Sequence, residues 1–473
     1  MNSADLCHLP AVELRRLYRT RELSPVDVTK AVLHRIERLN PAFNPFVTVT
    51  HERAVEEASR AERAYMGGEP GILAGIPGSL KDLTPTKGIR TARGSLLYKN
   101  WVPDYDAPLA ERLSNAGMVL LGKTTTPELG WKGDSGNRIN GPVHNPWMYG
   151  RTAGGSSGGA AAAVALGMGP VAQGTDGAGS IRIPCGFCGL YGLKPSWGRV
   201  PQYPASVVEL LSHAGPVTRT VTDAALMLTA MAGAHPMDRL SLPDDADYLR
   251  EMEGDIAGMR VAWSPDLGYV RVHPEVLSIA AAAAARFQEL GCHVEEAHPG
   301  LPDPWDIAHT IWSASFAGVF DDNLDDVRDL LDSGLVAVIE SGKSVSGSQL
   351  ATAYARRNDY YHGWREFMSA YDLFLCPTLP VTAFTAGHDH PVDIAGHPTS
   401  YLGWTAFTYP FNITGQPAAT VPAGFAGDGL PVGLQIVGRW RDDAGVLRAS
   451  AAFESLAPWN TKPPPAETKE RTV

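Results

Sequence analysis

Apolar residues recur with a helical period in the first 70 residues of the chain. Ser24-Pro25 supplies a capping hydroxyl and a proline suited to the first helical turn, and apolar positions follow over residues 28–39. Asn40-Pro41 is expected to end this helix. A second helix is predicted over residues 52–65. We therefore expect residues 1–70 to form a helical segment that packs on the rest of the protein.

The hydrophobic pattern changes after residue 72. Short apolar segments predict buried strands, and helical patterns stand between several of them. The predicted strands lie at residues 76–83, 118–121, 171–174 and 373–375, and the predicted helices at residues 108–116 and 221–232. This alternation predicts an α/β layered fold whose sheet is covered by helices on both faces. Because no clear linker interrupts it, residues 71–460 are predicted to form one large domain, followed by a flexible tail at residues 461–473.

Composition narrows the classes of protein. The 473 residues carry 40 Lys and Arg against 51 Asp and Glu, with no basic run of the kind that a nucleic-acid groove needs. The N-terminus lacks the pattern of a secretory signal, and the longest small and apolar stretch, residues 160–172, is shorter than the roughly 20 residues that cross a bilayer. Five scattered cysteines indicate free thiols in a reducing compartment. We expect a cytoplasmic protein without nucleic-acid or membrane partners, and a homodimer is left open.

Three segments carry candidate chemistry, and each alone also has an ordinary interpretation. Lys81 ends an apolar strand, where it either pairs with an acid such as Asp82 or loses its proton. Gly154-Gly155-Ser156-Ser157-Gly158-Gly159 lacks the ending of a phosphate loop but fits the spacing of a nucleophile elbow. The glycines of Gly177-Ala178-Gly179-Ser180 form either a plain turn or a set of N–H groups that converge on an oxyanion.

Together the three segments resemble the amidase signature family, whose members use a Ser–Ser–Lys triad. The resemblance runs over nearly the whole chain. It rests on residues 75–82, 145–147, 154–159, 174–184, 187–189, 192–195, 410–422 and 429–438. It implies a single large α/β domain with a central mixed β-sheet covered by helices on both faces, and a hydrolase that needs no metal or other cofactor.

Carried over position by position, the resemblance makes Ser180 the nucleophile, Ser156 the bridging serine and Lys81 the base. It also implies a cis peptide bond between Gly155 and Ser156. The implied oxyanion donors are the backbone N–H groups of Gly177, Ala178, Gly179 and Ser180. Support for this loop is expected from Ser157, Asp176 and Arg182, the last two as an ion pair that clamps the glycine-rich turn.

The proposed base has to be uncharged. Free lysine titrates near pH 10.4, so holding Lys81 neutral at pH 7 costs about 4.6 kcal/mol unless the site lowers its pKa. Burial beside Ile76 and Leu80 works in that direction. Since consecutive side chains of a strand point to opposite faces, Asp82 is expected to face away from Lys81.

The nucleophile loop departs from the family pattern, which usually reads Asp-Thr-Gly-Gly-Ser. Here the loop reads Asp176-Gly177-Ala178-Gly179-Ser180, so Ala178 is expected to have an ordinary, negative φ. Cys185 and Cys188 form a Cys-x-x-Cys pattern without a second pair, which favours buried thiols. His388-Asp389-His390 resembles a metal-ligand cluster but lacks further ligands, and no metal is expected there.

The favoured function is hydrolysis of a carboxamide C–N bond in a small apolar or aromatic amide. Alternatives with the same triad are a carbamate or anilide hydrolase and the glutamine-hydrolysing subunit of a tRNA-dependent amidotransferase. That subunit carries an Arg-Ile-Met-Leu-Gly-Thr-Tyr-like stretch which residues 338–360 lack, so a stand-alone enzyme is preferred over it. A binding protein without activity is disfavoured because all three triad positions are intact. Substrate-pocket walls are expected at Trp131, Tyr203, Trp312, Phe316 and Trp404.

Overall fold

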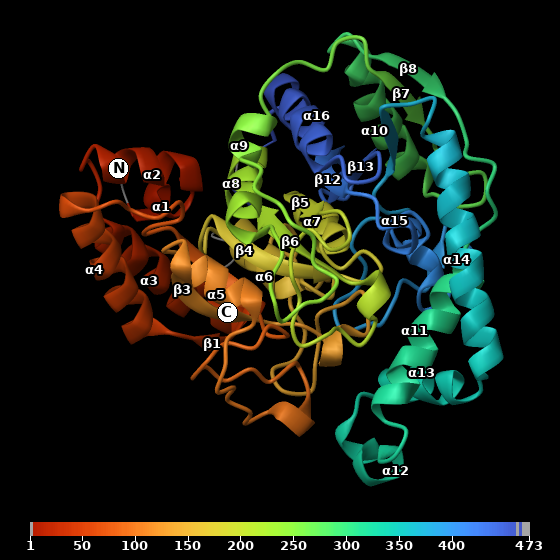
Figure 1. Cartoon of the computed structure of the whole chain (residues 1–473), viewed down its shortest axis with the longest axis horizontal. Coiled ribbons are helices and arrows are strands. Elements are labelled where there is room, and N and C mark those ends of the chain that lie inside the picture. The colour runs from red at the N-terminus through yellow and green to blue at the C-terminus, as the bar shows by residue number, and fades with distance from the viewer. Residues whose placement is uncertain (1–2, 460–462, 466–473) are drawn as a thin grey trace.

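A computed structural model describes residues 3–459 and 463–465, and within these residues eleven strands form one mixed sheet (Figure 1). In spatial order the strands are β1 Phe46–Val49, β3 Val119–Thr124, β2 Pro77–Lys81, β4 Val171–Asp176, β6 His213–Thr218, β5 Tyr191–Lys194, β12 Ala418–Phe425, β13 Pro431–Gly438, β9 Leu373–Pro377, β7 Arg260–Trp263 and β8 His293–Glu296. Strands β3, β2 and β4 run parallel, as do β9, β7 and β8, and the pairs between β4 and β9 are antiparallel. The strands predicted from the apolar segments are β2, β3, β4 and β9.

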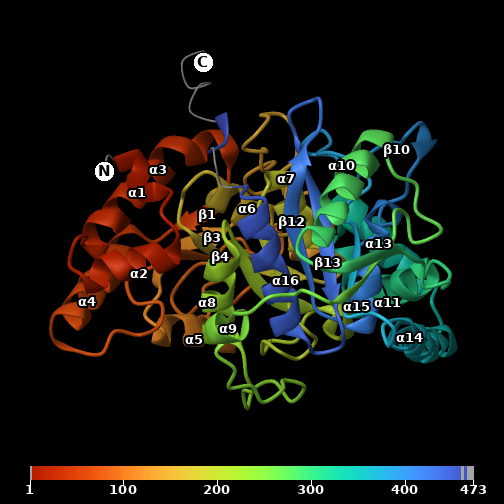
Figure 2. The same cartoon turned by 90° about the horizontal axis from the view of Figure 1, so that it is seen from above.

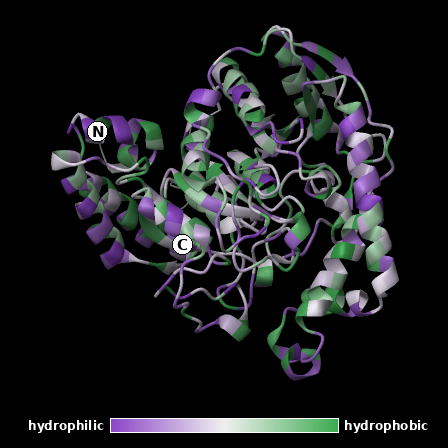
Figure 3. Ribbon diagram, in the orientation of Figure 1, coloured by the Kyte–Doolittle hydropathy of each residue, from purple (hydrophilic) through white to green (hydrophobic). Residues whose placement is uncertain are grey.

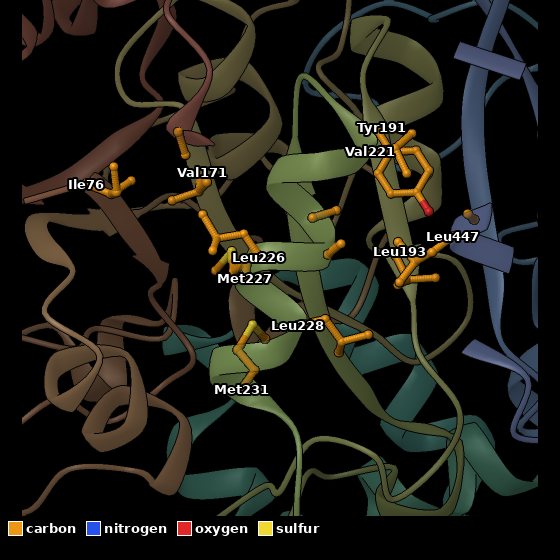
Figure 4. Packing of buried hydrophobic residues seen from close by; sticks show 14 of the residues in the cluster. Ile76, Val171, Tyr191, Leu193, Val221, Leu226, Met227, Leu228, Met231 and Leu447 are labelled. Carbon is orange, nitrogen blue, oxygen red and sulfur yellow. The ribbon is translucent and has the colours of Figure 1, made fainter. Parts of the chain in front are cut away.

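Helices cover both faces of this sheet, as the alternation of elements predicts. The two covered faces can be followed from β4, because Val171 packs into one buried cluster and the next residue, Ala172, packs into another. Helix α8 (Val221–Met231) belongs to the first cluster and helix α6 (Gly158–Ala165) to the second. Figure 4 shows side chains of α8 packed against residues of the central strands. Consecutive strand residues thus bury their side chains on opposite faces.

Some of the remaining helices pack on the strands themselves, and the others lie around the edges of the sheet (Figure 2). They are α1 Ser3–Cys7, α2 Ala11–Arg19, α3 Pro25–Phe43, α4 His51–Gly67, α5 Pro108–Asn115, α7 Arg182–Cys188, α9 Tyr248–Glu251, α10 Pro274–Ala285, α11 Trp305–Val319, α12 Leu324–Val327, α13 Ser333–Lys343, α14 Gly347–Phe367, α15 Tyr409–Thr414 and α16 Asp443–Leu456. A short hairpin of β10 (Asp393–Ile394) and β11 (His397–Pro398) lies outside the main sheet. Figure 3 shows hydrophilic residues recurring along the outlying helices α3, α4 and α14.

The N-terminal segment packs on the core but is not wholly helical. Strand β1 pairs antiparallel with β3 and forms one edge of the sheet, which the helical pattern did not predict. Helix α3 also runs three residues beyond Asn40 to Phe43, with Pro41 inside it. A proline this close to a helix end removes few hydrogen bonds, and Asn44 closes the helix with a φ of 56°.

Two further sequence expectations concern the ends of the chain and the membrane. Of the predicted tail, residues 461–462 and 466–473 lie outside the described residues. None of the helices in the described part of the chain is long and apolar enough to span a bilayer.

Candidate active site

Lys81 is the last residue of β2 and is completely buried. Its Nζ lies 2.7 Å from Ser156 Oγ, 2.9 Å from Ser157 Oγ and 2.9 Å from Thr175 Oγ1. Its backbone N–H donates to Gln173 Oε1, which ties the strand end to β4. Three hydroxyl groups therefore surround this amine, and no carboxylate among the described residues lies within ion-pair distance of it.

The hydrogen bonds of Ser157 fix the direction of one N–H of Lys81. The Ser157 hydroxyl donates to the Thr175 carbonyl at 3.1 Å and accepts from the Thr175 N–H at 3.2 Å. A hydroxyl has one proton to donate and two lone pairs, so only acceptance remains for its contact with Lys81. Lys81 consequently donates to Ser157. If neutral, it has one further N–H and one lone pair for Thr175 and Ser156.

Electrostatics favour the neutral form of Lys81. Burial lowers the pKa of its amine well below the ordinary value, and the more distant Asp176 opposes this only in part. Asp82 does not act on it: that carboxyl interacts with Lys123 and Arg90 instead. No ion pair joins Asp82 to Lys81 within the described residues, and Asp82 lies one position beyond the end of β2.

Ser156 lies between the end of one loop and the start of α6. The Gly155–Ser156 peptide bond is cis in the structure. Ser135 supports the turn, because its hydroxyl accepts from the Gly158 N–H at 2.8 Å and contacts the Gly154 carbonyl at 2.9 Å. A Cβ on Gly159 would lie 2.4 Å from the Thr125 nitrogen, so only glycine permits this approach of α6 to β3.

Ser180 lies in the turn between β4 and α7 and is 8% exposed. Its carbonyl accepts from the Ser157 N–H at 3.1 Å, which joins the two serine-containing segments. Its hydroxyl forms no hydrogen bond within 3.5 Å to any residue that the structure describes, Ser156 included. The structure thus joins Lys81 to Ser156 directly and brings Ser180 into the same cluster without a direct hydroxyl contact.

The expected ion pair between Asp176 and Arg182 is present, and both side chains are fully buried. Arg182 Nη2 lies 2.9 Å from Asp176 Oδ1, and its Nε lies 3.0 Å from Oδ2. Arg182 also donates to Asn412 Oδ1 and Gln435 Oε1. Burial alone would raise the pKa of Asp176, but Arg182, aided by Lys194 and Asn412, holds it well below its usual range.

Asp176 also takes up one of the four N–H groups predicted to face an oxyanion. The Gly179 N–H donates to Asp176 Oδ1 at 2.7 Å. The N–H groups of Gly177, Ala178 and Ser180 donate to no described residue, so three of the predicted donors stay free. The positive φ of this turn falls on Gly179, at 125°, and Ala178 has none, as expected from its side chain.

Of the five aromatic residues predicted to line a substrate pocket, Tyr203 lines the cavity beside this cluster. Its walls also include Thr175, which contacts Lys81. Trp312 lies instead against the nucleophile loop, since a Cβ on Gly177 would be 3.1 Å from its ring. Trp131, Phe316 and Trp404 are packed into buried clusters, where large rings lose the most contact with water.

The Cys-x-x-Cys pattern and the His-Asp-His stretch, which suggest redox or metal chemistry, make the contacts of ordinary structural residues. Cys185 and Cys188 are buried free thiols whose pKa values are raised by burial. Asp389, of the His388-Asp389-His390 stretch, accepts from Lys132 at 2.6 Å. Within residues 3–459 and 463–465, no group of three or more His, Cys, Asp or Glu side chains is arranged to hold a metal ion.

Sequence reasoning did not assign roles to Thr175, Asn412 or Gln435. Thr175 alternates with Asp176 at the end of β4, so strand periodicity could have placed the two on opposite faces. Asn412 and Gln435 lie 230 and 253 residues from Arg182 in the chain, and no local pattern signals such a contact.

Comparison with known proteins places this geometry in a family. The family model described as Amidase matches residues 27–447. The chain is 41% identical to an acylamidase of Rhodococcus erythropolis over 98% of both chains. It is 35% identical to a glutamyl-tRNA(Gln) amidotransferase subunit of Thermosynechococcus vestitus, over 96% of this chain and 98% of that one.

Solved structures agree with these matches. A bacterial aryl acylamidase of the amidase signature enzymes superimposes with a TM-score of 0.90 at 32% identity, over 96% of this chain and 97% of the other. A 6-aminohexanoate cyclic dimer hydrolase, solved with its substrate, gives a TM-score of 0.88 at 29% identity, over 97% and 99%. The chain therefore belongs to the amidase signature family, and it is an amide-hydrolysing enzyme.

Proposed function

We propose that this enzyme hydrolyses small apolar or aromatic amides through an acyl-enzyme on Ser180, with Ser156 as proton relay and Lys81 as base. The observation that carries the proposal is the position of Lys81: a fully buried amine with no carboxylate partner among the described residues, 2.7 Å from Ser156 Oγ. A buried lysine that is neutral accepts a proton, and a serine needs such an acceptor to become a nucleophile.

The proton path follows from the contacts of Lys81. Its N–H groups donate to Ser157 and Thr175, which directs the lone pair of the neutral amine at Ser156. Ser156 gives its proton to Lys81 and takes the proton of Ser180, and Ser180 Oγ bonds to the amide carbon. The C–N bond then breaks as Ser156 gives its proton to the departing amine and takes one back from Lys81. Water hydrolyses the ester along the same path in reverse, restoring all three side chains.

The nucleophile loop supplies the stabilisation of charge in this scheme. The negative oxygen of the tetrahedral intermediate accepts from the free N–H groups of Gly177, Ala178 and Ser180. The buried pair of Asp176 and Arg182 holds the loop in shape, since Asp176 also accepts from Gly179 within it. A preorganised donor set of this kind lowers the barrier because no dipole has to turn during the reaction.

The choice of substrate rests on similarity and on the walls of the site. The relative at 41% identity is named an acylamidase, and a structural neighbour is an aryl acylamidase. Tyr203 and Trp312 place aromatic surface beside the cluster. Anilides and carbamates fit the same acyl-transfer chemistry. Because the chain is 35% identical to an amidotransferase subunit, glutamine is a second substrate class to be tested.

A substrate panel tests the proposal. Aliphatic amides, anilides, carbamates and glutamine are assayed with the wild type, with Ser180→Ala and with Ser341→Ala, a control on the exposed surface of α13. We expect amide or anilide hydrolysis that Ser180→Ala abolishes and Ser341→Ala leaves intact. Ammonia release from glutamine alone, dependent on a partner protein, would assign the amidotransferase role instead. Unchanged turnover in Ser180→Ala would refute the mechanism.

A further inference from the structure

The cavity beside Lys81 contains a single fully charged side chain. Its described walls are mainly apolar or neutral, including Leu83, Leu129, Tyr203 and Val207, and no Asp or Glu is among them. Arg93 is the exception. A guanidinium in a wall without acids presents positive charge to whatever molecule enters.

Arg93 has no acceptor of its own within the described part of the protein. No carboxylate there lies within 4.0 Å of its guanidinium, and its Nε is buried without a hydrogen-bond partner. The guanidinium carbon lies 4.5 Å from the ring centre of Trp101 and 5.0 Å from that of Tyr98. Ring faces attract the cation but accept none of its five N–H groups in a directed hydrogen bond. The donor edge of Arg93 is therefore unsatisfied by the protein.

The buried carboxyl of Asp82 is influenced by cations other than Arg93. The carboxyl of Asp82 interacts with Lys123, whose Nζ donates to Thr86 Oγ1 and Thr91 Oγ1 at 3.0 Å. The positive charge of Arg93 lowers the pKa of Lys123. Arg93 thus lies near a second cation, Lys123, and it is not among the cations that act on the Asp82 carboxyl.

The backbone holds Arg93 firmly in this position. Its N–H donates to the Asp82 carbonyl at 3.1 Å, and its carbonyl accepts from the Leu129 N–H at 2.9 Å. Its φ of 54° is uncommon for a residue with a side chain. Both backbone bonds tie Arg93 to the loops that continue from Lys81 and that run beside Ser156, so its backbone keeps a fixed place relative to the reacting groups.

We infer that Arg93 binds a carboxylate carried by the substrate at a distance from the scissile amide, an inference that rests on the function proposed above. A planar guanidinium with free N–H groups matches a carboxylate in two parallel hydrogen bonds. The apolar walls of the cavity hold the hydrocarbon between the two ends, and Thr175, shared by the cavity and the Lys81 cluster, marks the end near the amide. The substrate class is an amide with a terminal carboxylate.

Two pairs of substrates test this and decide which half of the amide carries the acid. N-phenylsuccinamate, with an acyl-side carboxylate, is compared with N-phenylpentanamide, and 4-acetamidobenzoate, with an amine-side carboxylate, with 4-methylacetanilide. The wild type is expected to prefer one acid over its neutral partner. Arg93→Met should lower kcat/KM for that acid about 10- to 100-fold and for the neutral partner less than about threefold. Arg93→Lys, which keeps charge but not the planar fork, should fall between.

Arg90→Met is the matched control, because Arg90 donates to the Lys99 and Val47 carbonyls and does not line the cavity. It should leave the preference between acid and neutral substrate unchanged. Circular dichroism verifies the fold of each variant, and Arg93→Gln replaces Arg93→Met if the latter does not fold. Equal losses on acid and neutral substrates, or a wild type that prefers neither acid, would overturn the inference.

A binding measurement separates this inference from the proposed mechanism. Calorimetry on Ser180→Ala with the same two acids should give a Kd that rises at least tenfold when Arg93→Met is added. If the wild type hydrolyses no amide, such binding would refute the proposed function and keep the carboxylate site. Hydrolysis that depends on Ser180, together with acid binding that does not depend on Arg93, would support the proposed function and refute the carboxylate site.

Discussion

Lys81 and Asp82 are neighbours in the chain, yet their side chains interact with different groups. Lys81 Nζ contacts the hydroxyls of Ser156, Ser157 and Thr175, whereas the Asp82 carboxyl interacts with Lys123. The lysine is therefore buried beside an acid without being paired to it, and this allows its pKa to fall.

Replacing Asp82 by asparagine should leave the apparent pKa of the base almost unchanged. The carboxyl acts on the pKa of Lys123 and is not among the charges that shift the pKa of Lys81, so its charge contributes little there. The pH profile of kcat/KM, compared between the wild type and Asp82→Asn, measures this. A large fall in the pKa of the acidic limb in Asp82→Asn would contradict the geometry, because it would show that the carboxylate had been stabilising charged Lys81.

Lys81→Met should reduce kcat by about 10²- to 10⁴-fold, the usual range for loss of a general base. In the wild type, activity should fall as pH decreases through the pKa of Lys81, which burial lowers. Undiminished turnover in Lys81→Met would remove the base from the mechanism.

The stability of the wild type should also depend on pH through the lowered pKa of Lys81. Between the lowered pKa of the folded state and the ordinary value near 10.4, the unfolded chain binds more protons. The contribution of Lys81 to stability is therefore complete above the ordinary pKa and is lost as pH falls through the folded pKa. Denaturant unfolding across this range should show a steeper pH dependence in the wild type than in Lys81→Met.

Thr175→Val should lower kcat about tenfold with little change in KM. Without this acceptor, an N–H of neutral Lys81 turns toward Ser156 and competes with the lone pair that takes the Ser156 proton. Thr86→Val is the matched control, since the Thr86 hydroxyl contacts Lys123 and not Lys81. Equal losses in the two variants would mean that the effect of Thr175→Val does not act through Lys81.

Arg182→Met should destabilise the fold by about 3–5 kcal/mol, because it leaves Asp176 charged, buried and without its ion-pair partner. Urea unfolding measures the loss. The double variant Asp176→Asn with Arg182→Met should lose less than the sum of the single variants. Strict additivity would argue against a direct energetic coupling.

The same pair predicts a response to acid. The Arg182 guanidinium keeps the pKa of Asp176 below its unfolded value near 3.9, so the stability that this carboxylate provides is complete above that pH. It is lost as pH falls through the folded pKa. The acid limb of the stability curve should be shallower in Asp176→Asn than in the wild type.

Local patterns predicted much of the fold. Short apolar segments located strands β2, β3, β4 and β9, and the helical period located helices α5 and α8, because each depends on its own residues. They failed at β1, a four-residue edge strand whose pairing with β3 supplies its hydrogen bonds. They also failed at Pro41, where the last turn of α3 tolerates a proline.

For the candidate site too, the sequence predicted one part and the tertiary structure supplied the rest. The sequence alone determined which residue types could carry the chemistry, since Lys81, Ser156 and Ser180 stand in segments whose composition and family resemblance single them out. The tertiary structure decided which atoms meet: Lys81 with hydroxyls 75, 76 and 94 residues away, Arg182 with Asn412, and Gly179 with the carboxylate that occupies its N–H. Hydrogen bonds depend on distance and direction in space, and a chain sets these only once distant strands have paired and their side chains have packed.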